Sequence, residues 1–72
     1  MGSQNEQLAR MANEIALNLG AERDPETAVQ KTGEHLRKFW TVDMRRRLCD
    51  CDEAMLSGVV RRVVQDLGEA AP

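Results

Sequence analysis

Aromatic residues are scarce in this sequence, since it has no Tyr and its rings are limited to the adjacent pair Phe39 and Trp40. Cysteine, histidine and proline are also rare, with two, one and two residues respectively. No apolar run approaches the roughly 18 residues that a membrane-spanning helix needs. The first residues lack the charged start and apolar stretch of a signal peptide. We therefore expect a cytoplasmic protein that neither crosses nor enters a membrane.

The length and charge of the chain exclude further classes of function. Seventy-two residues suffice for one small domain and leave no room for separate cofactor and substrate domains. Ten Lys and Arg against twelve Asp and Glu give a net charge of −2, so the chain as a whole is not an electrostatic nucleic-acid binder. A core without other rings must be built from Leu, Val, Ile, Met and Ala, a set that favours helices.

Apolar residues recur at helical spacing in several segments. We predict a helix over 4–19 ended by Gly20, and a second helix from Asp24-Pro25 to about Trp40. A short third helix is capped by Thr41, and a fourth begins at Asp50 or Asp52. The side chains expected to face inward are Leu8, Met11, Ala12, Ile15, Ala16, Leu19, Ala28, Val29, Thr32, Leu36, Phe39, Trp40, Met44, Leu48, Cys51, Leu56, Val59, Val60, Val63, Val64 and Leu67.

These elements predict an all-α fold, a small helical bundle of three longer helices and one short helix. The single domain is expected over residues 4–67. Residues 1–3 and 68–72 are expected to be flexible termini.

Few residues are suited to catalysis or metal binding. His35 adjoins Glu34 in sequence, but neighbouring helical residues do not face each other, and neither serine lies in a nucleophile motif. Cys49 and Cys51 are too few for a disulfide framework and too closely spaced for a zinc site, which favours reduced thiols. We expect no catalytic residue, no metal and no cofactor in this chain.

Two regions are candidate contact surfaces. Arg10, Asn13 and Leu17 share the face of the first helix opposite its apolar stripe, and Gly58 falls on the outer face of the predicted fourth helix. The second region lies at the corner after the second helix and consists of His35, Phe39, Trp40, Met44 and Arg45. It is predicted either to contact a partner or to fill the space between the two helices, with Phe39 facing the core and Arg45 facing the partner.

Trp40 has two interpretations. Trp and Arg are enriched in binding hot spots, yet Trp40 could equally fill the corner between two helices. Residues 35–47 carry five basic residues against one acidic residue, a net of +4. An alternative function is therefore a free-standing helical nucleic-acid-binding module that uses the basic patch 35–47.

Three blocks of sequence resemble a known family. Residues 8–16 read Leu-Ala-Arg-Met-Ala-Asn-Glu-Ile-Ala, residues 35–40 read His-Leu-Arg-Lys-Phe-Trp, and residues 44–48 read Met-Arg-Arg-Arg-Leu. Together they resemble the delta subunit of cytoplasmic NAD-dependent formate dehydrogenase. The family usually has Asp-Pro after the Trp, where this chain has Thr41 and Val42.

The resemblance implies a non-catalytic subunit that binds the catalytic subunit or subunits of formate dehydrogenase. In such enzymes a molybdenum or tungsten pterin, iron–sulfur clusters and flavin belong to the large subunits. The small subunit is then expected to stabilise the complex or help assemble it. The resemblance leaves open which subunit is contacted and whether the chain associates with itself.

Overall fold

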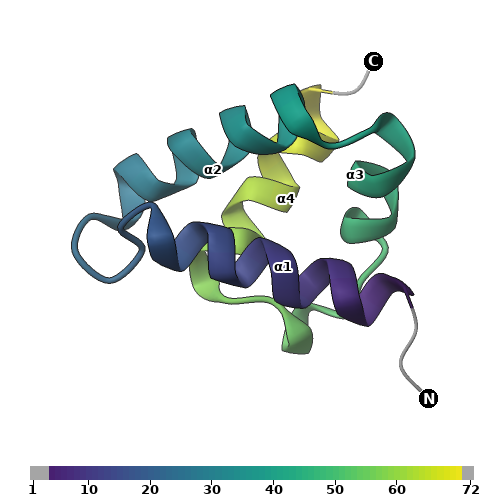
Figure 1. The fold of residues 1–72 in the computed structure, drawn as a ribbon, viewed down its shortest axis with the longest axis horizontal. Helices are drawn as coiled ribbons and strands as arrows, with labels where there is room; N and C mark the ends of the chain where they lie inside the picture. The colour runs from purple at the N-terminus through teal and green to yellow at the C-terminus, as the bar shows by residue number, and fades with distance from the viewer. Residues whose placement is uncertain (1–3, 71–72) are drawn as a thin grey trace.

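Four α-helices and one short 3₁₀ helix follow one another along residues 4–70, the part of the chain that the computed structural model describes (Figure 1). They are α1 (Gln4–Asn18), α2 (Pro25–Phe39), α3 (Val42–Cys49), η1 (Glu53–Met55) and α4 (Gly58–Ala70). No strand occurs in this range, which confirms the predicted all-α bundle of three longer helices and one short one.

The starts of α2 and α3 lie where the sequence carries capping residues. The carboxylate of Asp24 accepts hydrogen bonds from the backbone N–H of Thr27 (3.3 Å) and from its hydroxyl (2.6 Å). Both bonds hold the pKa of Asp24 below its ordinary value, and the bond from the Thr27 hydroxyl makes the larger contribution. The hydroxyl of Thr41 accepts from the backbone N–H of Met44 at 3.1 Å. Both predicted caps are confirmed.

Gly20 ends α1 as predicted, and its backbone explains why glycine is needed. Its φ is +99°, a region that residues with a Cβ rarely adopt. The N–H of Ala21 donates to the carbonyl of Ala16 (3.0 Å), and the N–H of Gly20 donates to the carbonyl of Leu17 (3.2 Å). This pair of bonds is a Schellman motif, which satisfies the last carbonyls of the helix.

A pair of glycine substitutions tests this geometry. Gly20→Ala should lower the free energy of unfolding by about 1–2 kcal/mol, because an L residue pays this cost in a left-handed conformation. Gly33→Ala is the matched control: it lies inside α2, and an added Cβ would meet no atom within 4 Å. It should raise stability by roughly 0.5–1 kcal/mol. Urea unfolding followed by circular dichroism measures both, and equal midpoints would contradict the assignment.

The last helix begins later than predicted. The Asp52 carboxylate caps η1 by accepting from the N–H of Ala54 (3.1 Å), and Leu56 then takes an extended backbone. The signal at Asp52 therefore serves a single 3₁₀ turn, and the prediction that α4 begins at Asp50 or Asp52 is wrong. Gly58 is the first residue of α4 and does not lie in the middle of a helix, where a glycine would lower stability. Its presence therefore gives no indication of a partner. The hydroxyl of Ser57 accepts from the N–H of Val60 at 3.4 Å.

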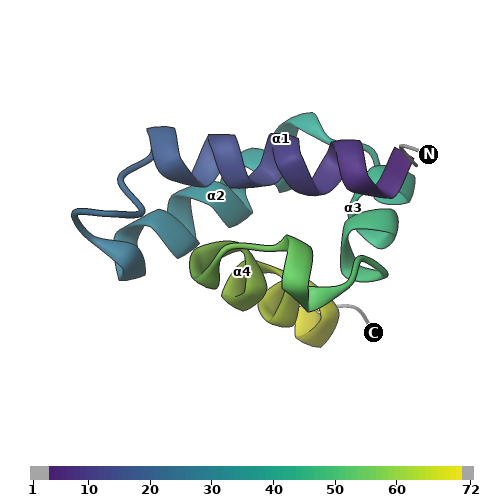
Figure 2. The ribbon, with the colours of Figure 1, turned by 90° about the horizontal axis from the view of Figure 1, so that it is seen from below.

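The bundle has α1 and α2 side by side and antiparallel, with α4 packed across them and α3 closing one end (Figures 1 and 2). The most extensive contact joins α2 to α4. The largest fully buried side chains are Leu36, Leu48, Val60, Val63 and Thr32. The tail expected from Gly68 falls partly within α4 and partly in residues 71–72, which, like 1–3, lie outside the described residues.

The core differs from the sequence prediction at two residues. Phe39 is 71 % exposed and Met11 is 42 % exposed, although both were predicted to face inward. Trp40, which was also predicted to face inward, is only 7 % exposed. It lies four positions after the fully buried Leu36, and its backbone N–H still donates to the Leu36 carbonyl at 3.0 Å, so its side chain shares the buried face of α2. Phe39, the last residue of α2, remains at the edge of the apolar stripe, where its ring contacts that of His35.

Candidate functional site

The cysteine and histidine side chains do not form a ligand set. Among the described side chains, those of residues 5–68, no three His, Cys, Asp or Glu side chains gather where they could hold a metal ion. His35 is half-buried and its ring centroid lies 4.8 Å from that of Phe39, with the planes tilted by 45°. Its immediate neighbour is thus an apolar ring.

Both thiols have structural neighbours. The thiol of Cys51 donates to the carbonyl of Asn5 at 3.1 Å, which ties the start of α1 to the segment after α3. Burial, helped by the charge of Asp50, raises the pKa of Cys49 and of Cys51 above the ordinary value for a thiol. Because the thiolate is the nucleophilic form, this environment holds both residues in their less reactive state at neutral pH.

Asn13 is engaged in the fold. Its amide Nδ2 donates to the carbonyl of Met55 (2.9 Å), and its Oδ1 accepts from the N–H of Ser57 (2.9 Å). These two bonds, which we call the Asn13 clamp, join the middle of α1 to the segment between η1 and α4. The interpretation of Asn13 as a free contact residue therefore needs correction. Arg10 and Leu17 are exposed, Leu17 by 55 %, and their predicted partner contact stays a prediction.

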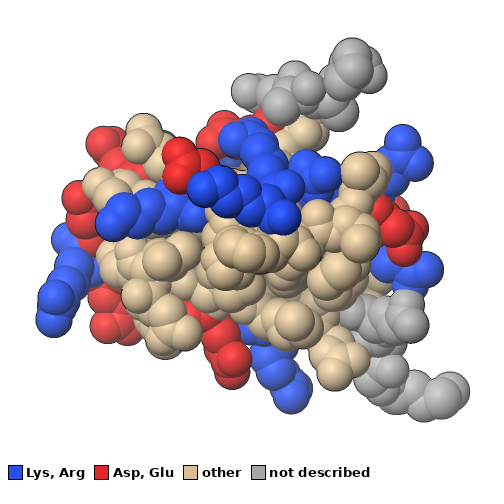
Figure 3. Space-filling view, turned by 45° about the horizontal axis from the view of Figure 1, so that its top comes forward, with Lys and Arg blue, Asp and Glu red and all other residues tan. Residues whose placement is uncertain are grey.

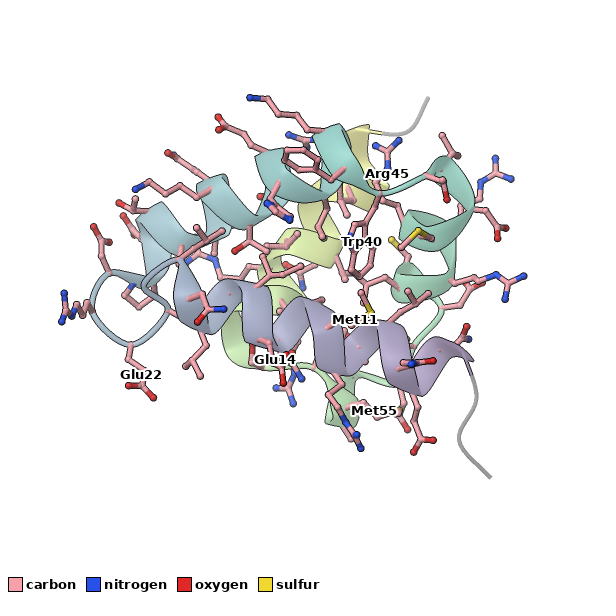
Figure 4. All side chains as sticks on the ribbon, viewed as in Figure 1. Met11, Glu14, Glu22, Trp40, Arg45 and Met55 are labelled. Carbon is pink, nitrogen blue, oxygen red and sulfur yellow. The ribbon has the colours of Figure 1, made fainter. Side chains whose placement is uncertain are left out.

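The corner between α2 and α3 brings the other predicted residues together, and Phe39 is the one whose predicted burial is wrong. Trp40 is buried and fills the corner, whereas Phe39 and Val42 (58 % exposed) face outward. Met44 is half-buried and packs against the core. Figure 4 shows Trp40 and Arg45 at the end of the molecule where α2 meets α3.

We define the Phe39 patch as the half-buried His35 with the exposed Phe39 and Val42. Sequence reasoning missed it because Phe39 continues the apolar spacing of α2. The adjacent Trp40 could have indicated the exposure of Phe39. Consecutive residues of a helix point in different directions, so the two rings do not fill the same space in the core. Phe39 and Val42 have the two largest exposed fractions among the large apolar side chains that are exposed.

Arg45 is half-buried and follows this patch in the sequence. Its Nε atom is shielded from solvent and has no hydrogen-bond partner among the side chains that the structure describes, those of residues 5–68. A shielded donor without an acceptor is unfavourable. The predicted contact of Arg45 with a partner stays a prediction.

Basic side chains surround the corner. Arg37 and Lys38 occupy the last turn of α2, where cations complement the helix dipole, and Arg46 is exposed on α3. Arg47 differs, because its Nε donates to Asp43 at 2.9 Å. Figure 3 shows Lys and Arg side chains gathered in a band across one face of the molecule, with a few carboxylates beside them.

A shallow groove lies between α1 and α3. Its volume is about 430 Å³, and its lining combines apolar and charged side chains, namely Gln7, Leu8, Met11, Asp43, Met44 and Arg47. The exposure of Met11, which the helical spacing assigned to the core, follows from this hollow.

None of the helices in residues 4–70 combines the length and apolarity of a membrane span. The described residues form a small all-α domain that carries the Phe39 patch and a shallow groove on its surface. A family model described as NADH-dependent formate dehydrogenase delta subunit FdsD matches residues 7–65. The chain belongs to this family, which confirms the resemblance seen in its sequence. Comparisons with curated proteins and with solved structures found no match.

Proposed function

We propose that this chain is a non-catalytic subunit of an NADH-dependent formate dehydrogenase that contains molybdenum or tungsten. In the cytoplasm it binds the catalytic subunit or subunits and stabilises the complex or helps it assemble. The family match carries the proposal, because residues 7–65 extend from α1 into α4 and so include every helix of the bundle. The contact surfaces at the α2–α3 corner and the α1–α3 groove are consistent with this role.

The physical basis of such stabilisation is mass action. A small subunit that binds the assembled form and not the dissociated or unfolded subunits shifts the equilibrium toward assembly. The effect depends on the concentration of the small subunit and on its affinity, and it requires no chemistry in the chain itself. No observation favours the alternative of a nucleic-acid-binding module, and the net charge of −2 opposes it.

Co-purification tests the proposal. The formate dehydrogenase subunits of the same organism are expressed with an affinity tag on one large subunit, with and without this chain. We expect the chain to co-purify in a fixed ratio and the complex that contains it to melt at a higher temperature. Elution of the untagged chain apart from the enzyme, together with unchanged melting, would contradict the proposal.

A further inference from the structure

The Phe39 patch exposes apolar side chains at a corner of the domain where another large ring is buried. Phe39 is the only phenylalanine, and the neighbouring Trp40 shows that a ring at this corner can be buried. Val42 opens α3 three residues later and is also exposed. Three residues of chain span at most about 11 Å, so both side chains belong to one small region.

The ring of Phe39 has one ring neighbour within the domain. It sits on the last turn of α2, with the His35 ring one turn earlier at 4.8 Å and the buried Trp40 immediately after it in sequence. Most of the ring's surface is left for a partner, since 71 % of Phe39 is exposed. Aromatic residues, Phe among them, are enriched in the cores of protein–protein interfaces.

The charges around the patch identify the chemistry of its partner. Residues 35–47 carry five basic residues against one acidic residue, and the acidic one, Asp43, is paired with Arg47. Lys38 and Arg46 are exposed, one on each helix of the corner. The Nε of Arg45 lacks an acceptor among the described side chains of residues 5–68, and a carboxylate brought to the corner would supply one after a small movement of the side chain.

We infer that Phe39 is the anchor by which this chain binds an acidic protein surface. The partner offers an apolar pocket for the Phe39 ring and the Val42 methyl groups, bordered by carboxylates that face Lys38, Arg45 and Arg46. The inference rests on the proposed function, so this acidic surface belongs to a large subunit of the formate dehydrogenase complex. Trp40 supports the anchor from within the core and does not touch the partner.

The test compares two exposed residues on different elements. Phe39→Ala removes the anchor, and Gln65→Ala, at an exposed position of α4 that belongs to neither predicted contact surface, is the control. Both variants should keep the circular dichroism spectrum and melting temperature of the parent. The dissociation constant, Kd, is measured by biolayer interferometry on the immobilised large subunits. We expect Phe39→Ala to raise the Kd about 30-fold or more, and Gln65→Ala to leave it unchanged.

The charge on the rim is tested separately. Arg46→Glu should slow association by about tenfold at low ionic strength and make the rate less sensitive to salt. The parent chain should associate more slowly as salt rises. An association rate that is independent of salt in both proteins would overturn the acidic partner surface.

The outcomes separate this inference from the proposed function. If the parent chain fails to bind the large subunits, both fail. If it binds and Phe39→Ala binds equally well, the inference fails and the proposed function stands. If the isolated parent is a dimer that Phe39→Ala converts to monomers without changing the Kd for the large subunits, the patch joins two copies of this chain and the inference is wrong.

Discussion

Trp40→Ala should lower the free energy of unfolding by about 3–5 kcal/mol, the usual cost of truncating a buried large aromatic side chain. Trp40 is 7 % exposed and lies in the same core as Leu36 and Leu48. A domain of this length has a total stability of roughly 4–10 kcal/mol. We therefore expect the variant to be largely unfolded on mild heating. Thermal and urea unfolding followed by far-ultraviolet circular dichroism measure the change.

Phe39→Ala is the matched control for this prediction, because the two rings are adjacent in sequence and differ in burial. With 71 % of its surface exposed, Phe39 should change stability by no more than about 0.5 kcal/mol. The ratio of the two losses is the informative quantity. A Phe39→Ala loss as large as that of Trp40→Ala would show that both rings contribute to the core.

Asn13→Ala should lower the free energy of unfolding by about 1–3 kcal/mol, because it removes both hydrogen bonds of the Asn13 clamp. The loss leaves the carbonyl of Met55 and the N–H of Ser57 without their partner. Asn18→Ala, an exposed position at the end of α1, is the control and should have little effect. Urea unfolding at neutral pH gives both values.

Asn13→Asp separates the two bonds of the clamp. The aspartate can still accept from the N–H of Ser57, but its second oxygen faces the carbonyl of Met55, where the amide was a donor. We expect a loss at neutral pH that shrinks in acid, because the protonated carboxyl can donate again. A variant as stable as the parent at neutral pH would show that the bond to Met55 contributes nothing.

Local signals in the sequence were sufficient for most of the helices. Asp24, Thr41 and Gly20 each act within a few residues, and the structure places all three where their caps and turn require them. The start of α4 was harder to predict, because Asp52 carries the same signal for a 3₁₀ turn as for a longer helix. Periodicity could not show that the extended backbone at Leu56 separates the two elements.

The contact residues were less predictable, for two physical reasons. The partners of Asn13 lie 42 and 44 positions further along the chain, so no local pattern marks it as structural. Phe39 and Trp40 lie three and four positions after the fully buried Leu36, so helical spacing places both rings near the apolar stripe and cannot show that the core admits only one of them. The structure buries Trp40 and leaves Phe39 exposed.

The burial of Trp40 has an optical consequence. The chain has one tryptophan and no tyrosine, so its ultraviolet fluorescence arises almost wholly from the α2–α3 corner. An indole in an apolar environment emits at shorter wavelength than one in water, so unfolding shifts the emission to the red. Because Phe39 is the residue immediately before Trp40 in the chain, the same unlabelled chromophore lies next to the patch and reports on events at its surface.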